Sequence, residues 1–445
     1  MTDNGNGKGN AVLTKTAAAE NGGNGGNGGS RGRFAGLGER ARLRAAQSPV
    51  WARPVVMALN LVFAPFGVVA DVLRDWWSVQ GRGMRWVVYG LLVLFALVLP
   101  SDVIGDVMSP HTEWQTLLFF PIGGYILLAI GLNVVVGQAG LLDLGYVAFF
   151  AVGGYTMAIF GKYHGWNFWE ILVVGVLIAA LSGIVLGAPT LRLRGDYLAI
   201  VTLGFGEIIR ISAQNWDYVN GPNGISGIPH PPNLSEWSFP DGQPWEFLGV
   251  AGMSPFTYGA LDGRPYYYLM LVVIIAVIIF CKRLENSRVG RSWAAIREDE
   301  DAAELMGVPT FKFKLAAFAI GAAIGGAAGV VYGSQATSII PNNFPFILSA
   351  TILAAVVLGG SGNLPGVMVG AFLVAWLPEY FRGLAEYRIL IFGGALVVMM
   401  ALRPEGILPS RRRQAELAEG TGGMGSLGAE VGGPDTHAAA VEGAK

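Results

Sequence analysis

Ten apolar stretches, each long enough to cross a membrane as a helix, constrain this chain more than any other feature. A helix rises about 1.5 Å per residue, so roughly 20 apolar residues cross the ~30 Å hydrocarbon core of a bilayer. The stretches are residues 86–104, 115–137, 141–160, 168–189, 195–213, 264–281, 315–335, 346–363, 366–382 and 388–404. Only 14% of the 445 residues are charged, compared with roughly 25% in soluble domains. The sequence therefore predicts an all-α fold, a polytopic membrane helix bundle of about ten spans.

Basic residues between these stretches predict the orientation. If all ten stretches cross, most of the basic residues between and beside them lie on one side of the membrane. They are Arg82, Arg85, Arg192, Arg194, Arg403, Arg411, Arg412, Arg413 and the basic residues within 282–314. Cytoplasmic loops of membrane proteins carry an excess of lysine and arginine. We therefore expect a multi-pass protein of the inner cell membrane, with both termini in the cytoplasm, an inner loop at 282–314 and an external loop at 213–265.

Composition divides the chain into four segments. Residues 1–45 are rich in Gly and Asn, and residues 411–445 in Gly, Ala and Glu. Neither tail has enough apolar surface to fold, so both are predicted to be disordered. Residues 46–85 are basic, and their short apolar run at 55–70 is expected to lie on the inner membrane surface, with a crossing as the alternative. Residues 86–410 then form the membrane domain.

Motifs for enzymatic chemistry and for nucleic-acid binding do not occur in the sequence. It holds no Gly-x-x-x-x-Gly-Lys-Ser/Thr phosphate loop, so the chain is not expected to hydrolyse ATP alone. Cys281 is the single cysteine, and the four histidines have no metal-ligand spacing. We therefore nominate no catalytic residue, metal or cofactor. A net charge of −1 without a dense basic tract argues against a nucleic-acid partner.

The inner loop at 282–314 contains the signal for a short helix. Four consecutive acids, Glu298–Asp301, suit the positive N-terminal end of a helix. Gly307 can end that helix in a left-handed conformation, and Pro309 prevents its continuation. The sequence thus predicts one short, exposed helix at the centre of the loop.

One face of this short helix is small and weakly apolar. Ala302 and Ala303, followed by Leu305 and Met306, suit a groove on another protein. A membrane protein that presents such a helix is expected to receive force from a partner. We therefore expect Ala303 to contact that partner, so that a bulky charged residue there would block the contact.

Glycines recur at every fourth position in the stretch 315–335. They are Gly321, Gly325, Gly329 and Gly333. A ridge without side chains allows two helices to approach closely. The ridge therefore predicts helix packing within the chain, and a moving interface or a subunit seam is the alternative.

Three polar residues within the apolar stretches are candidates for a translocation path. Charged groups inside a membrane are expensive and usually face the protein interior. Glu207, which we expect to face that interior, has Arg210 one turn away and fits either an internal ion pair or a polar wall of a solute path. Asp143 suits either the path or a helix cap, and Asn133 is the third candidate.

Four stretches of the sequence match one family of membrane permeases. They are Gly131–Tyr146, Leu191–Glu207, Gly221–Ile225 and Arg403–Pro409. On these residues the chain resembles the LivM-type permease subunits of bacterial branched-chain amino-acid ABC importers. The resemblance covers about 115–410, and its longest continuous part leads to Glu207.

The resemblance implies a subunit of a larger importer. Its partners would be a second, LivH-like permease, two ABC ATPase subunits on the inner face and an extracytoplasmic solute-binding protein, with membrane lipid around the spans. The solute would be leucine, isoleucine or valine, and ATP hydrolysis would take place on the partner chains.

The resemblance also assigns a role to the short helix. Glu300, Asp301, Ala302, Ala303 and Gly307 look like the loop by which ABC import permeases engage their ATPases, with Asp301 in place of the usual glutamate. The Ile-x-Leu-Pro ending of many permeases for other solutes does not follow Gly307. The resemblance at this point therefore covers the short helix alone.

Three other functions compete with this interpretation. An importer of urea or short amides has permeases that resemble this chain closely. A secondary transporter driven by ions differs in class, but it would need several buried carboxylates or broken helices aimed at an ion, and Glu207 alone is thin support. A membrane scaffold without transport does not account for the short helix.

Overall fold

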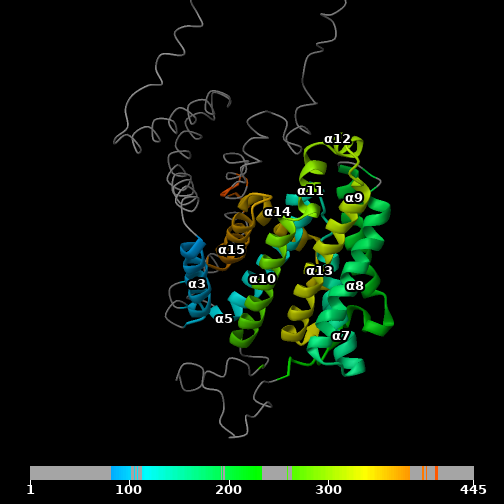
Figure 1. Cartoon of the computed structure of the whole chain (residues 1–445). Coiled ribbons are helices and arrows are strands. Elements are labelled where there is room, and N and C mark those ends of the chain that lie inside the picture. The colour runs from blue at the N-terminus through cyan, green and yellow to red at the C-terminus, as the bar shows by residue number, and fades with distance from the viewer. Residues whose placement is uncertain are drawn as a thin grey trace, which may run out of the picture. The chain divides into compact units, whose positions relative to one another are not determined.

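The computed structural model describes residues 82–101, 113–191, 196–232 and 263–380 almost completely (Figure 1). Single positions are described at 105, 108, 193, 258, 393, 394, 397 and 406–408. All of them belong to one compact unit, residues 69–445. The expectations for the tails 1–45 and 411–445 and for the run 55–70 lie outside the described residues, as does most of the external loop.

Helices make up nearly all of the described structure. They are α3 (Arg82–Val98), α5 (Trp114–Leu117), α6 (Gly124–Asn133), α7 (Val147–His164), α8 (Phe168–Thr190), α9 (Asp196–Gln214), α10 (Gly263–Glu285), α11 (Arg288–Glu298), α12 (Glu300–Leu305), α13 (Thr310–Ala336), α14 (Phe346–Gly359) and α15 (Leu364–Tyr380). Leu118–Gly123 connects α5 to α6 through a kink at Phe120, whose backbone is extended (φ −147°, ψ 125°), and the π turn Val134–Gln138 continues α6. Together they form one long rod, Trp114–Gln138, that bends at Phe120. Two short strands, β1 (Ile225–Ser226) and β2 (Ser338–Ile339), pair antiparallel, with Ile225 opposite Ile339.

Five helical segments among the described residues have the length and apolar composition needed to cross a membrane. They are Trp114–Gln138, Phe168–Thr190, Gly263–Glu285, Thr310–Ala336 and Pro341–Gly359. The predicted helical membrane bundle is therefore confirmed. Helices occupy nine of the ten predicted stretches, and the tenth, 388–404, lies largely outside the described residues. The count of ten crossings stays a prediction.

The predicted stretch 141–160 begins its helix later than expected, at Val147. Gly140 has a left-handed backbone, with φ of 75°. The Asp143 carboxylate then accepts a hydrogen bond from the Gly145 amide at 2.9 Å. Such a local bond between side chain and backbone competes with helix formation. Residues 139–146 are therefore non-helical and connect the long rod to α7.

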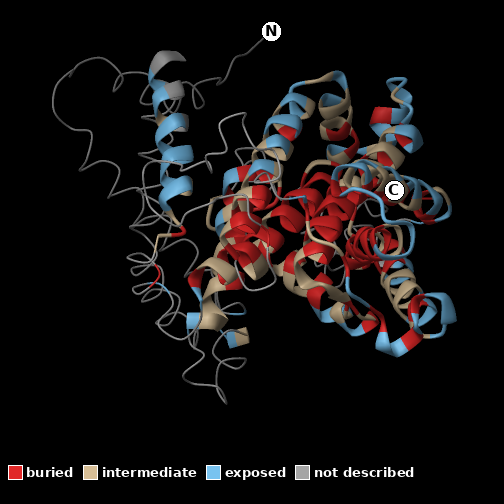
Figure 2. Ribbon diagram, turned by 90° about the horizontal axis from the view of Figure 1, so that it is seen from below, coloured by how far each residue is buried: buried red, intermediate tan, exposed pale blue. Residues whose placement is uncertain are grey.

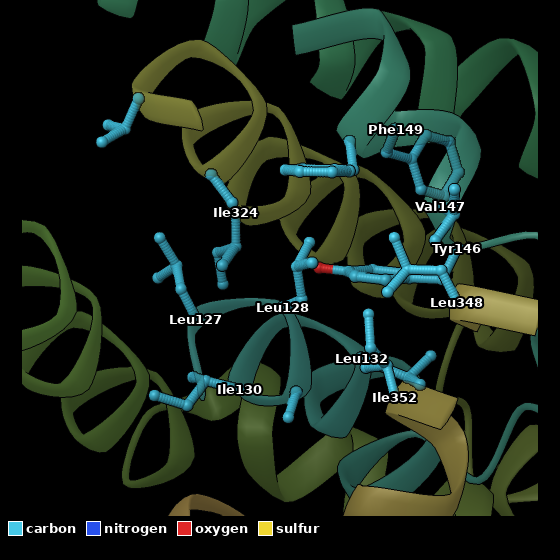
Figure 3. Close-up of a cluster of buried hydrophobic side chains, with 14 of the residues drawn as sticks. Leu127, Leu128, Ile130, Leu132, Tyr146, Val147, Phe149, Ile324, Leu348 and Ile352 are labelled. Atoms are coloured by element: carbon cyan, nitrogen blue, oxygen red, sulfur yellow. The ribbon is translucent and has the colours of Figure 1, made fainter. Parts of the chain in front are cut away.

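The core forms where α7, α8 and α13 pack against one another and against α6 and α14. Figure 2 shows the buried residues concentrated in the middle of the helix bundle, with exposed residues around them. In Figure 3, apolar side chains from four elements converge, including Leu132 of α6, Phe149 of α7, Ile324 of α13 and Ile352 of α14. Tyr146, fully buried beside them, donates to the carbonyl oxygen of Gly321 at 2.8 Å.

Small residues allow these helices to touch backbone to backbone. A methyl group on Gly329 of α13 would lie 2.1 Å from the carbonyl oxygen of Phe150 in α7. On the neighbouring side of α13, a methyl group on Gly326 would lie 2.3 Å from the Cβ of Ala179 in α8. Because there is no space for a Cβ at either glycine, α13 contacts both neighbours at the closest possible distance.

The face of α8 that points away from the bundle is apolar and exposed. Every fourth residue lies on it, including Val173, Leu177, Leu181 and Val185, which are 59 to 64% exposed. Helix positions four apart share one face. A continuous aliphatic stripe of this kind suits contact with lipid hydrocarbon.

We expect Gly329→Ala to destabilise the protein by about 1–3 kcal/mol, because the new methyl group overpacks the contact with Phe150. The measurement is the thermal unfolding midpoint of the purified protein in detergent. Gly90→Ala in α3 is the matched control, since a methyl group there meets no atom within 4 Å. Equal midpoints for the two variants would contradict this account of the helix packing.

Candidate functional site

The short helix predicted in the inner loop is present as α12, at one end of the bundle (Figure 1). Asp299 caps its start, because its Oδ1 accepts a hydrogen bond from the Ala302 amide at 3.0 Å. Gly307, with φ of 84°, ends it in the left-handed conformation, and the Val308 amide then donates to the carbonyl oxygen of Ala303 at 3.0 Å. Local sequence signals therefore determine both ends of α12.

The outward face of α12 differs from the predicted one. Ala303 is only 5% exposed, so its side chain turns toward its own chain, whereas Ala302 is exposed. Leu305 and Met306 are 89% and 85% exposed. Since residues on a helix are about 100° apart, Ala303 and Leu305 point to nearly opposite sides. The predicted face is therefore wrong at Ala303, whose side chain is covered by its own chain, and the exposed apolar side chains are Leu305 and Met306.

Side chains of α11 and α12 anchor this end of the bundle to α13. The fully buried Trp293 of α11 donates from its indole nitrogen to the carbonyl oxygen of Phe313 at 2.7 Å. Glu300 of α12 forms an ion pair with Lys314, whose side chain is buried in the first turns of α13. Both contacts tie α11 and α12 to the start of one long helix, so these elements are positioned together.

Glu207 and Arg210 form the predicted ion pair on α9. The Glu207 Oε2 lies 2.8 Å from Nε and 2.7 Å from Nη2 of Arg210. The side chains are 30% and 24% exposed, respectively. Within this chain the pair is thus partly exposed rather than enclosed in the interior as we expected, because α9 packs only against one side of the bundle. Gly204, one turn earlier, also faces open space, since a methyl group there would meet nothing within 4 Å.

Asn133 and Asp143, the other two path candidates, are buried. The Asn133 Oδ1 accepts a hydrogen bond from the Gly362 amide at 2.8 Å, in the turn between α14 and α15. Asp143 is 1% exposed and lies in the non-helical segment before α7. That segment packs on α9, where a methyl group on Gly206 would lie 3.3 Å from the Cα of Gly145. The structure therefore brings Asp143 near the helix of Glu207, and it holds Asn133 against a different turn.

The glycines of the predicted ridge lie against α6 and α7 of the same chain. A methyl group on Gly321 would lie 2.6 Å from Cγ2 of Val135, and one on Gly325 would lie 3.2 Å from Cβ of Phe149. Gly329 meets Phe150, and Gly333 faces Met157 of α7 at 3.3 Å. These contacts fit the reading of close packing within the chain.

Sequence reasoning missed several polar residues that connect one element to another. Lys314 and Arg297 were seen only as part of a charged loop, and Thr202 and Ser349 only as parts of apolar stretches. The hydroxyls of Thr202 and Ser349 accept backbone hydrogen bonds from Leu144 and Val147, each at 3.0 Å. Their partners are distant in the sequence, so no local pattern could have indicated them.

Comparison with known proteins identifies the family. Residues 116–400 match the family model described as branched-chain amino acid transport system / permease component. The chain belongs to this family. It is 43% identical over 303 residues to the high-affinity branched-chain amino acid transport system permease protein LivM of Escherichia coli (strain K12), covering 66% of this chain and 70% of that protein. The predicted resemblance is confirmed, and the permease is a multi-pass membrane subunit rather than an enzyme.

Other relatives of the permease are more distant. The probable LivM permease of Methanocaldococcus jannaschii is 26% identical over 360 residues, which cover 68% of this chain and 95% of that protein. The LivH permease of Escherichia coli (strain K12) is 27% identical over 296 residues, covering 64% and 91%. No solved structure matches the permease significantly.

Proposed function

We propose that this chain is the permease subunit of an ATP-driven importer that moves leucine, isoleucine and valine into the cytoplasm. The observation that carries the proposal is the 43% identity to a LivM permease over 303 residues. The family match at 116–400 spans α6 to α15 and includes α12. The similarity thus covers both the membrane helices and the element that would receive force.

The proposed importer contains several other chains. Similarity to a protein named LivH supports a second permease of the same fold, because two related subunits can pair around a shared path. Two ABC ATPases would supply the energy, and an extracytoplasmic protein would bind the solute. In this arrangement the membrane domain, 86–410, crosses ten times, the loop 213–265 lies outside, and α12 and both termini lie in the cytoplasm.

The ATPase contact is assigned to the outward face of α12. Leu305 and Met306 are almost fully exposed at the end of the bundle, and exposed apolar side chains side by side mark interaction sites. Glu300 and Asp299 hold the backbone of α12 in place through Lys314 and the Ala302 amide. In the proposal, Asp301, Ala302 and Gly307 shape the helix, while Leu305 and Met306 enter a groove on the ATPase.

The solute path is assigned to the exposed side of α9. An ion pair that is 24–30% exposed on a membrane helix is expensive to place in hydrocarbon, so protein or water must cover it. The bare backbone at Gly204 leaves space beside it. The exposed stripe on α8 carries no such pair, although α9 also exposes aliphatic side chains such as Ile200 and Ile208. Glu207 and Arg210 would therefore form a wall of the path, and the buried Asn133 and Asp143 would support its inner end.

The first test of the proposal is uptake by the complex of the permease with its partner chains in vesicles. We expect ATP-dependent uptake of radiolabelled leucine that excess isoleucine or valine inhibits and excess urea does not. Inhibition by urea alone would favour the amide importer. Uptake that follows an ion gradient and does not require ATP would favour the secondary transporter.

Charged substitutions on α12 test the ATPase contact. We expect Leu305→Asp and Met306→Glu to reduce the amount of ATPase that co-purifies with the permease by about tenfold, because a charge would be buried in an apolar groove. Met306→Leu is the matched control, since it conserves an apolar side chain of similar volume. Normal co-purification with both charged variants would exclude this face of α12 as the contact.

Two substitutions at Glu207 separate a functional from a structural role. Glu207→Gln keeps the shape and can still accept from Arg210, so we expect slower uptake with a normal amount of complex. Glu207→Leu leaves Arg210 without its carboxylate partner, and we expect less folded complex as well. Transport assays and size-exclusion chromatography measure the two effects. If both variants matched the parent, Glu207 would be neither part of the path nor a structural partner.

A further inference from the structure

Residues 137–147, which connect the rod Trp114–Gln138 to α7, bond to three helices from other parts of the chain. The carbonyl oxygen of Gly137 accepts a hydrogen bond from Nη1 of Arg297 on α11. The Leu144 amide donates to the hydroxyl of Thr202 on α9, and the Val147 amide donates to the hydroxyl of Ser349 on α14, each at 3.0 Å. We call these residues the 137–147 segment. It is a junction between the α12 end of the bundle and α9.

The contact with α11 is close and electrostatically favourable. The Gly137 carbonyl belongs to the last turn of the rod, where carbonyls lack helical partners and a cation is stabilised. The Arg297 side chain also packs on Gly140, since a methyl group there would lie 2.9 Å from its Cγ. The fully buried Trp293 anchors the same helix one turn earlier. A displacement of α11 therefore acts directly on the end of the rod.

The contact between the 137–147 segment and α9 is equally close. A methyl group on Gly145 would lie 1.9 Å from the carbonyl oxygen of Thr202, so the two backbones touch. The Thr202 hydroxyl accepts the Leu144 hydrogen bond in the same place. Thr202 lies five positions before Glu207 on the same helix. Movement of the 137–147 segment along the bundle therefore carries with it the part of α9 that precedes Glu207.

A second branch of the junction leads to α14 and α15. Asn133, fully buried in the last turn of α6, accepts from the Gly362 amide in the turn between these helices. A methyl group on Gly137 would lie 2.0 Å from the Asn133 Oδ1. The hydrogen bond from Gly362 to Asn133 and the hydrogen bond from Arg297 to Gly137 are therefore both made at Gly137 or beside it. The turn at 360–363 is thereby held to the same end of the rod.

We propose that Arg297 is a positioning residue that transmits the movement of α11 and α12 through the 137–147 segment to α9. Its guanidinium holds the Gly137 carbonyl, and the Thr202 hydroxyl passes the displacement to the helix of Glu207 and Arg210. Asn133 distributes the same displacement to the turn between α14 and α15. This inference rests on the proposed function, in which ATPases act on α12.

The test compares transport with ATP hydrolysis in the full complex in vesicles. We expect Arg297→Gln to leave the amount of co-purified ATPase and the rate of ATP hydrolysis within about twofold of the parent, and to lower leucine uptake about tenfold. Arg297→Lys can still donate to the Gly137 carbonyl and should recover at least half of the uptake. The control is Arg283→Gln, an exposed arginine in the last turn of α10, which should keep the parent ratio of uptake to hydrolysis.

A second pair of variants tests the other side of the junction and does not depend on Arg297→Gln folding. Thr202→Val has nearly the same shape but cannot accept from the Leu144 amide, whereas Thr202→Ser keeps the hydroxyl. We expect the valine variant to hydrolyse ATP with about tenfold less uptake per ATP, and the serine variant to retain the parent ratio. A parent ratio of uptake to hydrolysis in both Arg297→Gln and Thr202→Val would overturn the inference.

Failure of the proposed function gives a different result. In that case the parent complex itself shows no ATP-dependent uptake of branched-chain amino acids, and the proposed role of Arg297 is excluded together with the proposed function. If the parent transports and the Arg297 and Thr202 variants lose uptake only in proportion to complex lost, the importer stands and the transmission role is excluded.

Discussion

The close approach of α13 to α7 and α8 is the constraint on which the rest of the structure depends. Gly329 meets the backbone of α7, and Gly326 meets Ala179 of α8, without room for a single additional methyl group. Association of helices in a membrane relies on such packing because lipid tails are as apolar as the helix surfaces. With α13 held in this way, its first turns form a base to which α11 and α12 are attached through the Phe313 carbonyl and Lys314.

Hydrogen bonds to backbone groups connect this base to the remaining helices. Trp293 bonds the carbonyl of Phe313, Arg297 that of Gly137, and the hydroxyls of Thr202 and Ser349 bond the amides of the 137–147 segment. The backbone groups named here are thereby paired in an apolar environment, where an unpaired one is costly. The same bonds connect α11, α9 and α14 through the 137–147 segment.

The outward faces of the permease are of two chemical kinds. The exposed stripe on α8 is aliphatic throughout, whereas α9 combines exposed aliphatic side chains, among them Ile200, Ile208 and Ile211, with a partly exposed ion pair. Because charged groups are expensive in lipid, the second face indicates contact with protein or water. The two helices are consecutive in the sequence and similar in length. In our proposal, lipid covers the stripe on α8, and the solute path passes the ion pair on α9.

The sequence by itself determined features that depend on local chemistry: the apolar stretches, the ends of α12 at Asp299 and Gly307, the Glu207–Arg210 pair and the family resemblance. Only the tertiary structure decided that Ala303 turns inward, that Glu207 stays partly exposed, and that Asn133 bonds an amide 229 residues away. Periodicity and capping rules act over a few residues. Which face of a helix is covered, and by what, depends on contacts between distant segments that no local pattern encodes.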